Sequence, residues 1–137
     1  MQEATNESNV SYGGGRKVVL LGDTHNSAPI KHLAQGAHLI SHEATFLDQM
    51  YVKARIATHS TGVMAGEFAR EIQAKQLVLT HFSGRYGHTG ESPSVSIGTE
   101  EEERRVDDDL KLLKREAEQA MGSRNVACAF DGFTWRL

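Results

Sequence analysis

The sequence predicts an α/β fold, because short apolar runs alternate along the chain with segments that have the spacing of amphipathic helices. The apolar runs are rich in β-branched residues and end in glycine or polar residues, which is typical of buried strands. The clearest examples are residues 17–21 and 77–80. With 137 residues and a hydrophobic share of 39%, the chain has enough apolar material for one compact core.

The first third of the chain predicts two strands joined by a short helix. Residues 17–21 form the first expected strand, which ends at a glycine. A helix is expected to begin at Pro29, because the fixed φ of proline suits the first helical turn, and to end near Gly36. The second expected strand covers residues 38–41 and leads directly into the polar pair His42-Glu43.

The middle of the chain predicts a weak helix over residues 46–55 and a stronger one after it. Ser60 and Thr61 offer caps for this second helix. The third expected strand, residues 77–80, runs straight into His81. Apolar residues recur every four positions along one side of the second helix: Met64, Phe68 and Ile72.

The last third predicts a loop over residues 84–99 and then a long helix. Thr99 with Glu102 makes a capping box at the start of that helix, and Gly122 ends it. Two final strands, residues 126–130 and 133–137, are expected to pair through the turn between them. Residues 1–15, which end in three glycines, are expected to form a flexible lead-in, so that the domain covers residues 16–137.

Charge and composition restrict the function classes. The net charge is −3, from fifteen basic and eighteen acidic residues, so binding RNA would need a local basic patch or another chain. Cys128 is the only cysteine, which excludes an internal disulfide and fits a reducing compartment. No apolar run approaches the roughly 20 residues of a membrane span. We expect an intracellular, cytoplasmic protein without a membrane partner, with nucleus and mitochondrion as alternatives.

Polar residues stand where the predicted strands end. Asp23 follows the first strand, Glu43 follows the second, and His81 follows the third. Because ligands of open α/β sheets bind beyond the carboxyl ends of the strands, this placement indicates a site, and carboxylates and imidazoles are ordinary zinc ligands. Each residue also has a structural alternative, since Asp23 could cap the next turn and His81 could be a hydrogen-bonded core histidine.

His59 stands just before the cap of the second helix, where free backbone N–H groups suit a phosphate. A histidine at this place could protonate a leaving oxygen, provided that a carboxylate holds its ring, and Glu43 is the candidate carboxylate. The alternative is that His59 only shapes the start of the helix.

Four ordered strings within residues 16–86 resemble the ribonuclease Z family, the tRNA 3′-end-processing endonucleases with a metallo-β-lactamase αββα fold. The ordered combination is more specific than any one string. The strings are Gly22-Asp23-Thr24, His42-Glu43-Ala44-Thr45, His59-Ser60-Thr61 and Leu79-Thr80-His81-Phe82-Ser83-Gly84-Arg85-Tyr86.

This resemblance implies a zinc-dependent endoribonuclease that removes the 3′ trailer from precursor tRNA. It implies that Asp23 bridges two zinc ions, that His81 is the last histidine ligand, and that His59 and Glu43 protonate the leaving 3′ oxygen. Three further residues would lie near the substrate phosphate: Thr61, Ser83 and Arg85.

The family's main metal motif, His-x-His-x-Asp-His, does not occur in this sequence. The resemblance therefore implies the C-terminal half of the αββα sandwich, with the remaining zinc ligands on a missing N-terminal half. We expect the chain to be inactive alone, as a fragment, a truncated gene model or a natural half-protein. The alternative function is a non-catalytic remnant that serves as a binding or assembly module. The parent could be the short, homodimeric form of the family or the long, duplicated one.

Overall fold

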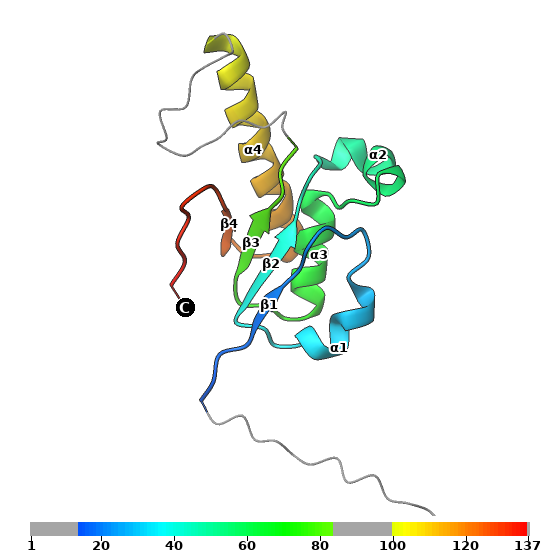
Figure 1. The fold of residues 1–137 in the computed structure, drawn as a ribbon, viewed down its shortest axis with the longest axis vertical. Helices are drawn as coiled ribbons and strands as arrows, with labels where there is room; N and C mark the ends of the chain where they lie inside the picture. Colours follow the sequence, from blue (N-terminus) through cyan, green and yellow to red (C-terminus); the bar gives the residue numbers. More distant parts are fainter. Residues whose placement is uncertain (1–13, 84–99, 137) are drawn as a thin grey trace, which may run out of the picture.

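A computed structural model describes residues 14–83 and 100–136. Their strands form one parallel sheet in the order β1-β2-β3-β4, so each strand pairs with the next one along the chain. Figure 1 shows this sheet with helices α3 and α4 along one of its faces. The strands are β1 (Val18–Leu20), β2 (Leu39–Glu43), β3 (Leu77–Thr80) and β4 (Val126–Cys128).

The helices connect these strands and follow the predicted order. The hydroxyl of Thr61 caps α3 by accepting a hydrogen bond from the Met64 N–H, and Gly122, with a φ of 74°, follows the end of α4. Within the described residues, no helix has the length and apolar character to cross a membrane. The helices are η1 (Ala28–Ile30), α1 (Lys31–Ala34), η2 (Asp48–Met50), α2 (Tyr51–Ile56), α3 (Gly62–Glu71) and α4 (Glu100–Met121).

One apolar row crosses the whole sheet and forms the centre of the core. The strand register aligns Val19, Ile40, Leu77 and Val126 side by side, and all four pack in the core cluster with residues of α3 and α4. On the opposite face, the edge strand β1 leaves Leu20 75% exposed. Among the described residues, this face is therefore open at β1, whereas Val78 of β3 in the same row is 6% exposed.

The predicted final hairpin is wrong. Strand β4 is shorter than expected and pairs in parallel with β3, and residues 133–136 form no strand. Instead, the ring of Phe133 contacts both Phe130 and Trp135, and the Trp135 indole N–H donates to Gln76 Oε1 at 2.7 Å. The aromatic residues of the expected last strand thus pack against one another and do not pair with a strand. The expected lead-in before residue 14, the loop over 84–99 and the Thr99 cap lie outside the described residues.

Two glycines let α3 and α4 pack closely. A Cβ atom on Gly62 would lie 2.7 Å from the Leu113 carbonyl oxygen, and one on Gly66 would overlap the carbonyl oxygen of Ala117. Backbone atoms cannot move aside unless a whole helix shifts, so these positions require glycine. The contact fixes α3, and with it the residues that precede its N-terminus.

His42 is a histidine of the core. Its Nδ1 lies 2.7 Å from the Glu43 carbonyl oxygen, which can only accept, so Nδ1 carries the proton and Nε2 accepts from the Ser27 hydroxyl at 2.8 Å. The ring also contacts Phe68 of α3. Burial lowers the pKa of His42 and outweighs the opposing effects of the Glu43 carbonyl and carboxylate.

We expect Gly66→Ala to lower the free energy of unfolding by about 1–3 kcal/mol, because the added methyl group forces the two helices apart. Gly15→Ala is the matched control, since a Cβ there meets nothing within 4 Å. Urea denaturation followed by circular dichroism measures both changes. Equal stabilities of the two variants would contradict the close contact.

We expect acid to destabilise the fold through His42. Because the folded state lowers its pKa below the ordinary 6.5, the unfolded chain binds the proton more readily. The stability that neutral His42 contributes is complete above that pH and falls as the pH drops, by at most about 1.4 kcal/mol per pH unit. Urea denaturation across this range should show a flatter pH dependence for His42→Asn, and equal slopes would argue against the buried neutral imidazole.

Candidate active site

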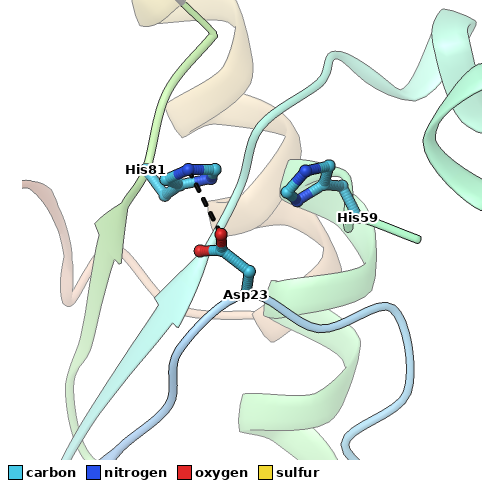
Figure 2. A group of neighbouring side chains, drawn as sticks. All are labelled: Asp23, His59 and His81. Carbon is cyan, nitrogen blue, oxygen red and sulfur yellow. Dashed lines mark ion pairs between the residues drawn. The ribbon is translucent and has the colours of Figure 1, made fainter. Parts of the chain in front are cut away.

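The carboxyl ends of three neighbouring parallel strands bring the predicted site residues together. Asp23 lies in the loop after β1, Glu43 is the last residue of β2, and His81 directly follows β3. His59 joins them from the segment before α3. Figure 2 shows Asp23 below the rings of His81 and His59, which come from separate segments of the chain.

Asp23, His59 and His81 form a compact group of ligand atoms. One potential ligand atom from each residue lies within 4.8 Å of the others. Among the described residues, this is the group of three or more such side chains that could hold a metal ion. Nε2 of His81 lies 3.4 Å from Asp23 Oδ2, and the rings of His59 and His81 stack with centroids 5.1 Å apart. Two imidazoles and a carboxylate are a donor set that fits zinc.

The side chains of this group are open to solvent on one side. Asp23 is 55% exposed and His81 is 47% exposed, whereas His59 is 24% exposed. A substrate could therefore approach Asp23 and His81 directly. His59 lies deeper, beside a carboxylate that solvent does not reach.

That carboxylate is Glu43, whose side chain is 1% exposed. Its Oε1 accepts from the Thr24 N–H at 2.8 Å and contacts His59 Nδ1 at 2.9 Å, while Oε2 accepts from the Thr45 hydroxyl at 2.6 Å. Burial alone would raise the pKa of Glu43, but the hydrogen bonds from Thr45, His59 and the Ser60 and Thr24 backbone together lower it. Glu43 is therefore a buried, ionised acceptor.

The contact with Glu43 fixes the ring of His59. Because an ionised carboxylate can only accept, Nδ1 of His59 carries a proton at the 2.9 Å contact with Oε1. A histidine oriented by a carboxylate in this way can hold a proton at its other nitrogen and transfer it to a nearby oxygen. The structure thus brings together the pair His59 and Glu43 that the sequence suggested.

His81 adopts a left-handed backbone conformation, with a φ of 54°. For a residue other than glycine this conformation is strained by about 1–3 kcal/mol, and surrounding contacts must hold it. Thr45 supplies one of them, since its hydroxyl lies 2.9 Å from the His81 carbonyl oxygen. The strained position turns the chain sharply at the end of β3, where the imidazole meets Asp23.

Hydrogen bonds from the neighbouring elements also fix the loop that carries Asp23. The Ser60 hydroxyl donates to the Thr24 carbonyl oxygen at 2.6 Å, and Ser27 bonds to His42. Together with the Thr24 N–H that donates to Glu43, these bonds hold the loop just after Asp23, and before Asp23 the Leu21 N–H donates to the Ser41 carbonyl oxygen. Sequence reasoning assigned no role to Thr24 or Thr45 and offered Ser60 only as a cap of α3, although all three stand in the strings that carry the resemblance.

The residues predicted to lie near a substrate phosphate differ in their placement. Thr61 is fully buried, and its hydroxyl accepts from the Met64 N–H and donates to Asp48. Ser83 is half-buried, and its N–H donates to the Thr45 carbonyl oxygen at 3.3 Å. Arg85 lies outside the described residues, so the phosphate contacts of all three remain predictions.

No model of a protein family matches this sequence. The sequence is, however, 35% identical over 119 residues to "Ribonuclease Z" of Ligilactobacillus salivarius, a match that covers 87% of this chain and 32% of the relative. It is 40% identical over 120 residues to "Zinc phosphodiesterase ELAC protein 1" of Bos taurus, covering 85% of this chain and 30% of the relative. The chain thus spans about a third of the length of these relatives.

Solved structures show the same relationship. The metallo-β-lactamase fold protein YhfI from Bacillus subtilis superposes with a TM-score of 0.65 over 90% of this chain and 41% of its own, at 23% identity, which is evidence for the fold alone. The short form of human tRNase Z is 46% identical, with a TM-score of 0.50 over 53% of this chain and 29% of its own. The sequence is therefore similar to about a third of each ribonuclease Z relative, and the sheet and helices have the metallo-β-lactamase fold.

Proposed function

We propose that this chain is part of a zinc-dependent endoribonuclease that removes the 3′ trailer from precursor tRNA. The observation that carries the proposal is the buried Glu43–His59 pair next to the exposed group of Asp23 and His81. This arrangement joins a proton donor to a metal-binding carboxylate and imidazole at one edge of the sheet. The names of the relatives, a ribonuclease Z, a zinc phosphodiesterase and a tRNase Z, support the same reaction.

Of the group of three, Asp23 and His81 are the residues that would hold zinc, and His59, whose ring is bonded to Glu43, is left for proton transfer. Their exposure leaves both side chains accessible to further ligands, and the two carboxylate oxygens of Asp23 suit a bridging role between two ions. When bound, zinc ions supply Lewis acidity that favours attack by water and stabilises charge on the phosphate. Two such ions need more ligands than these, so the part of the domain that lies outside this chain would supply the others.

His59 would act as the general acid. When the oxygen of an attacking water bonds to phosphorus, the water releases a proton to solvent and the bond from phosphorus to O3′ breaks, and His59 transfers a proton to that leaving oxygen. Glu43 accepts from Nδ1 of His59 and stabilises the protonated ring until transfer. Because its hydrogen bonds lower the pKa of Glu43, this carboxylate stays ionised throughout.

The phosphate itself would lie near Ser83, Arg85 and the start of α3. The hydroxyl of Thr61 is committed to Met64 and Asp48, so we propose that Thr61 acts by presenting the N–H groups of the helix end that it caps. The net charge of −3 makes Arg85 and the missing half of the domain the expected sources of positive charge for tRNA.

The proposal predicts that zinc-dependent cleavage appears on reconstitution. The chain should be mixed with an N-terminal half of a ribonuclease Z that carries His-x-His-x-Asp-His, and trailer removal from a labelled precursor tRNA should be followed with and without a chelator. We expect metal-dependent cleavage from the complex and none from either half. Asp23→Ala should abolish it, because zinc loses its bridging carboxylate.

Asp108→Ala is the matched control for Asp23→Ala, since Asp108 is 70% exposed on α4 and forms an ion pair with an exposed lysine. A folded complex that binds zinc but cleaves no precursor would leave the non-catalytic assembly role as the better explanation. Full activity of Asp23→Ala would contradict the bridging role.

A second prediction concerns the leaving group. His59→Ala should slow cleavage of an ordinary precursor by about 10²–10⁴-fold in the reconstituted enzyme, because the leaving O3′ loses its proton donor. A precursor with sulfur in place of the bridging O3′ has a leaving group that needs no proton. On this substrate, the cleavage rate of the same variant should be within about tenfold of the rate of the unmodified enzyme.

Single-turnover kinetics on both substrates gives the comparison. Asp23→Ala serves as the contrast, because its defect should persist with the sulfur substrate. An equal loss for His59→Ala on both substrates would rule out the general-acid role.

A further inference from the structure

We propose that Thr45 is a positioning residue that fixes which nitrogen of His81 carries the proton, so that the other nitrogen stays free for a metal ion. This inference rests on the proposed function for its purpose, but its geometry stands within this chain. Thr45 is buried, with 7% exposure, between the carboxylate of Glu43 and the imidazole of His81.

The hydroxyl of Thr45 has a single proton, and its position can be deduced from its neighbours. The oxygen lies 2.6 Å from Glu43 Oε2, a distance at which two oxygens must share a hydrogen. Glu43 is ionised and cannot provide it, so the proton belongs to Thr45 and points at the carboxylate. The longer contact with the His81 carbonyl oxygen, 2.9 Å, can take only a minor share of the same proton.

The assignment of that proton determines the state of His81. Nδ1 of His81 lies 2.9 Å from the Thr45 oxygen, whose proton is already used, so Nδ1 must be the donor. In the neutral ring this leaves Nε2 without a proton. Nε2 is the atom that faces Asp23 Oδ2 at 3.4 Å, on the exposed side where a metal ion would bind.

One carboxylate therefore orients two histidines. Glu43 Oε1 holds His59 directly, and Oε2 holds His81 through the Thr45 hydroxyl. Histidine ligands of metals ordinarily have such a partner on the second nitrogen, which sets the tautomer and the ring orientation. Thr45 provides this partner for His81, and its own carbonyl oxygen accepts from the N–H of Ser83, two residues after His81.

The chain contains an internal contrast in His38. Nδ1 of His38 accepts the Lys17 backbone N–H at 3.1 Å, so the proton of its neutral ring must lie on Nε2. His38 and His81 are thus expected to be opposite tautomers within the same molecule.

Heteronuclear NMR of the nitrogen-labelled imidazoles in the full metal-free chain tests the inference at about pH 8, where ordinary histidines are neutral. We expect His81 to carry its proton on Nδ1 and His38 on Nε2, with His81→Gln and His38→Gln assigning the signals. Thr45→Val should move the His81 proton to Nε2, where Asp23 can accept it, whereas Thr45→Ser should leave it on Nδ1.

A proton on Nε2 of His81 in the unmodified chain would overturn the inference, and so would an unchanged tautomer in a folded Thr45→Val chain. If that variant does not fold, the unmodified chain and Thr45→Ser decide the outcome. Zinc affinity of the reconstituted domain should fall about 10–100-fold for Thr45→Val and much less for Thr45→Ser. If the tautomers are as expected but no reconstituted complex cleaves RNA, the proposed function fails while the role of Thr45 stands.

Discussion

The structure depends on one buried, charged side chain, the carboxylate of Glu43. An ionised carboxylate that is 1% exposed, as in Glu43, costs several kcal/mol unless hydrogen-bond donors surround it. These donors come from three separate segments, namely Thr24 after β1, Thr45 after β2 and His59 before α3. Because Thr24 adjoins Asp23 and Thr45 contacts His81, satisfying one buried charge also places the exposed group. Stability and site geometry are therefore coupled through Glu43.

The sheet and helices supply the frame for this network. A parallel sheet brings the ends of β1, β2 and β3 to one edge, and the close contact of α3 with α4 at Gly66 fixes the helix that follows His59. His42, one residue before Glu43, points to the helix side and bonds to Ser27, so β2 holds the Asp23 loop from both faces of the sheet. The result is a rigid set of supports beneath side chains that remain open to solvent.

Much of this could be predicted from the sequence, because the relevant signals are local. Buried strands such as β3, the Thr61 cap of α3 and the glycine at the end of α4 all have local patterns, and the ordered strings contain the residues that the structure brings together. The other features depend on contacts between distant residues. Nothing local indicates that Gly66 faces Ala117, that His81 is left-handed, or that Trp135 bonds to Gln76. The predicted last strand failed for that reason.

The role of Thr45 could not be predicted from the sequence either, because it depends on contacts with distant residues. Its place in the string His42-Glu43-Ala44-Thr45 marked it as part of the motif, yet only the distances to Glu43 and His81 reveal a relay between them. The buried carboxylate and the exposed group therefore form one network, in which Glu43 orients the histidines and Asp23 with His81 is proposed to receive the metal.

Crystallography of the reconstituted domain with zinc, using anomalous scattering at the zinc edge, would test this division of roles. We expect anomalous peaks in contact with Asp23 and His81, with the Glu43 carboxylate still bonded to Thr45 and His59 and out of reach of the metal. A peak ligated by Glu43, or the absence of any peak between Asp23 and His81, would contradict it.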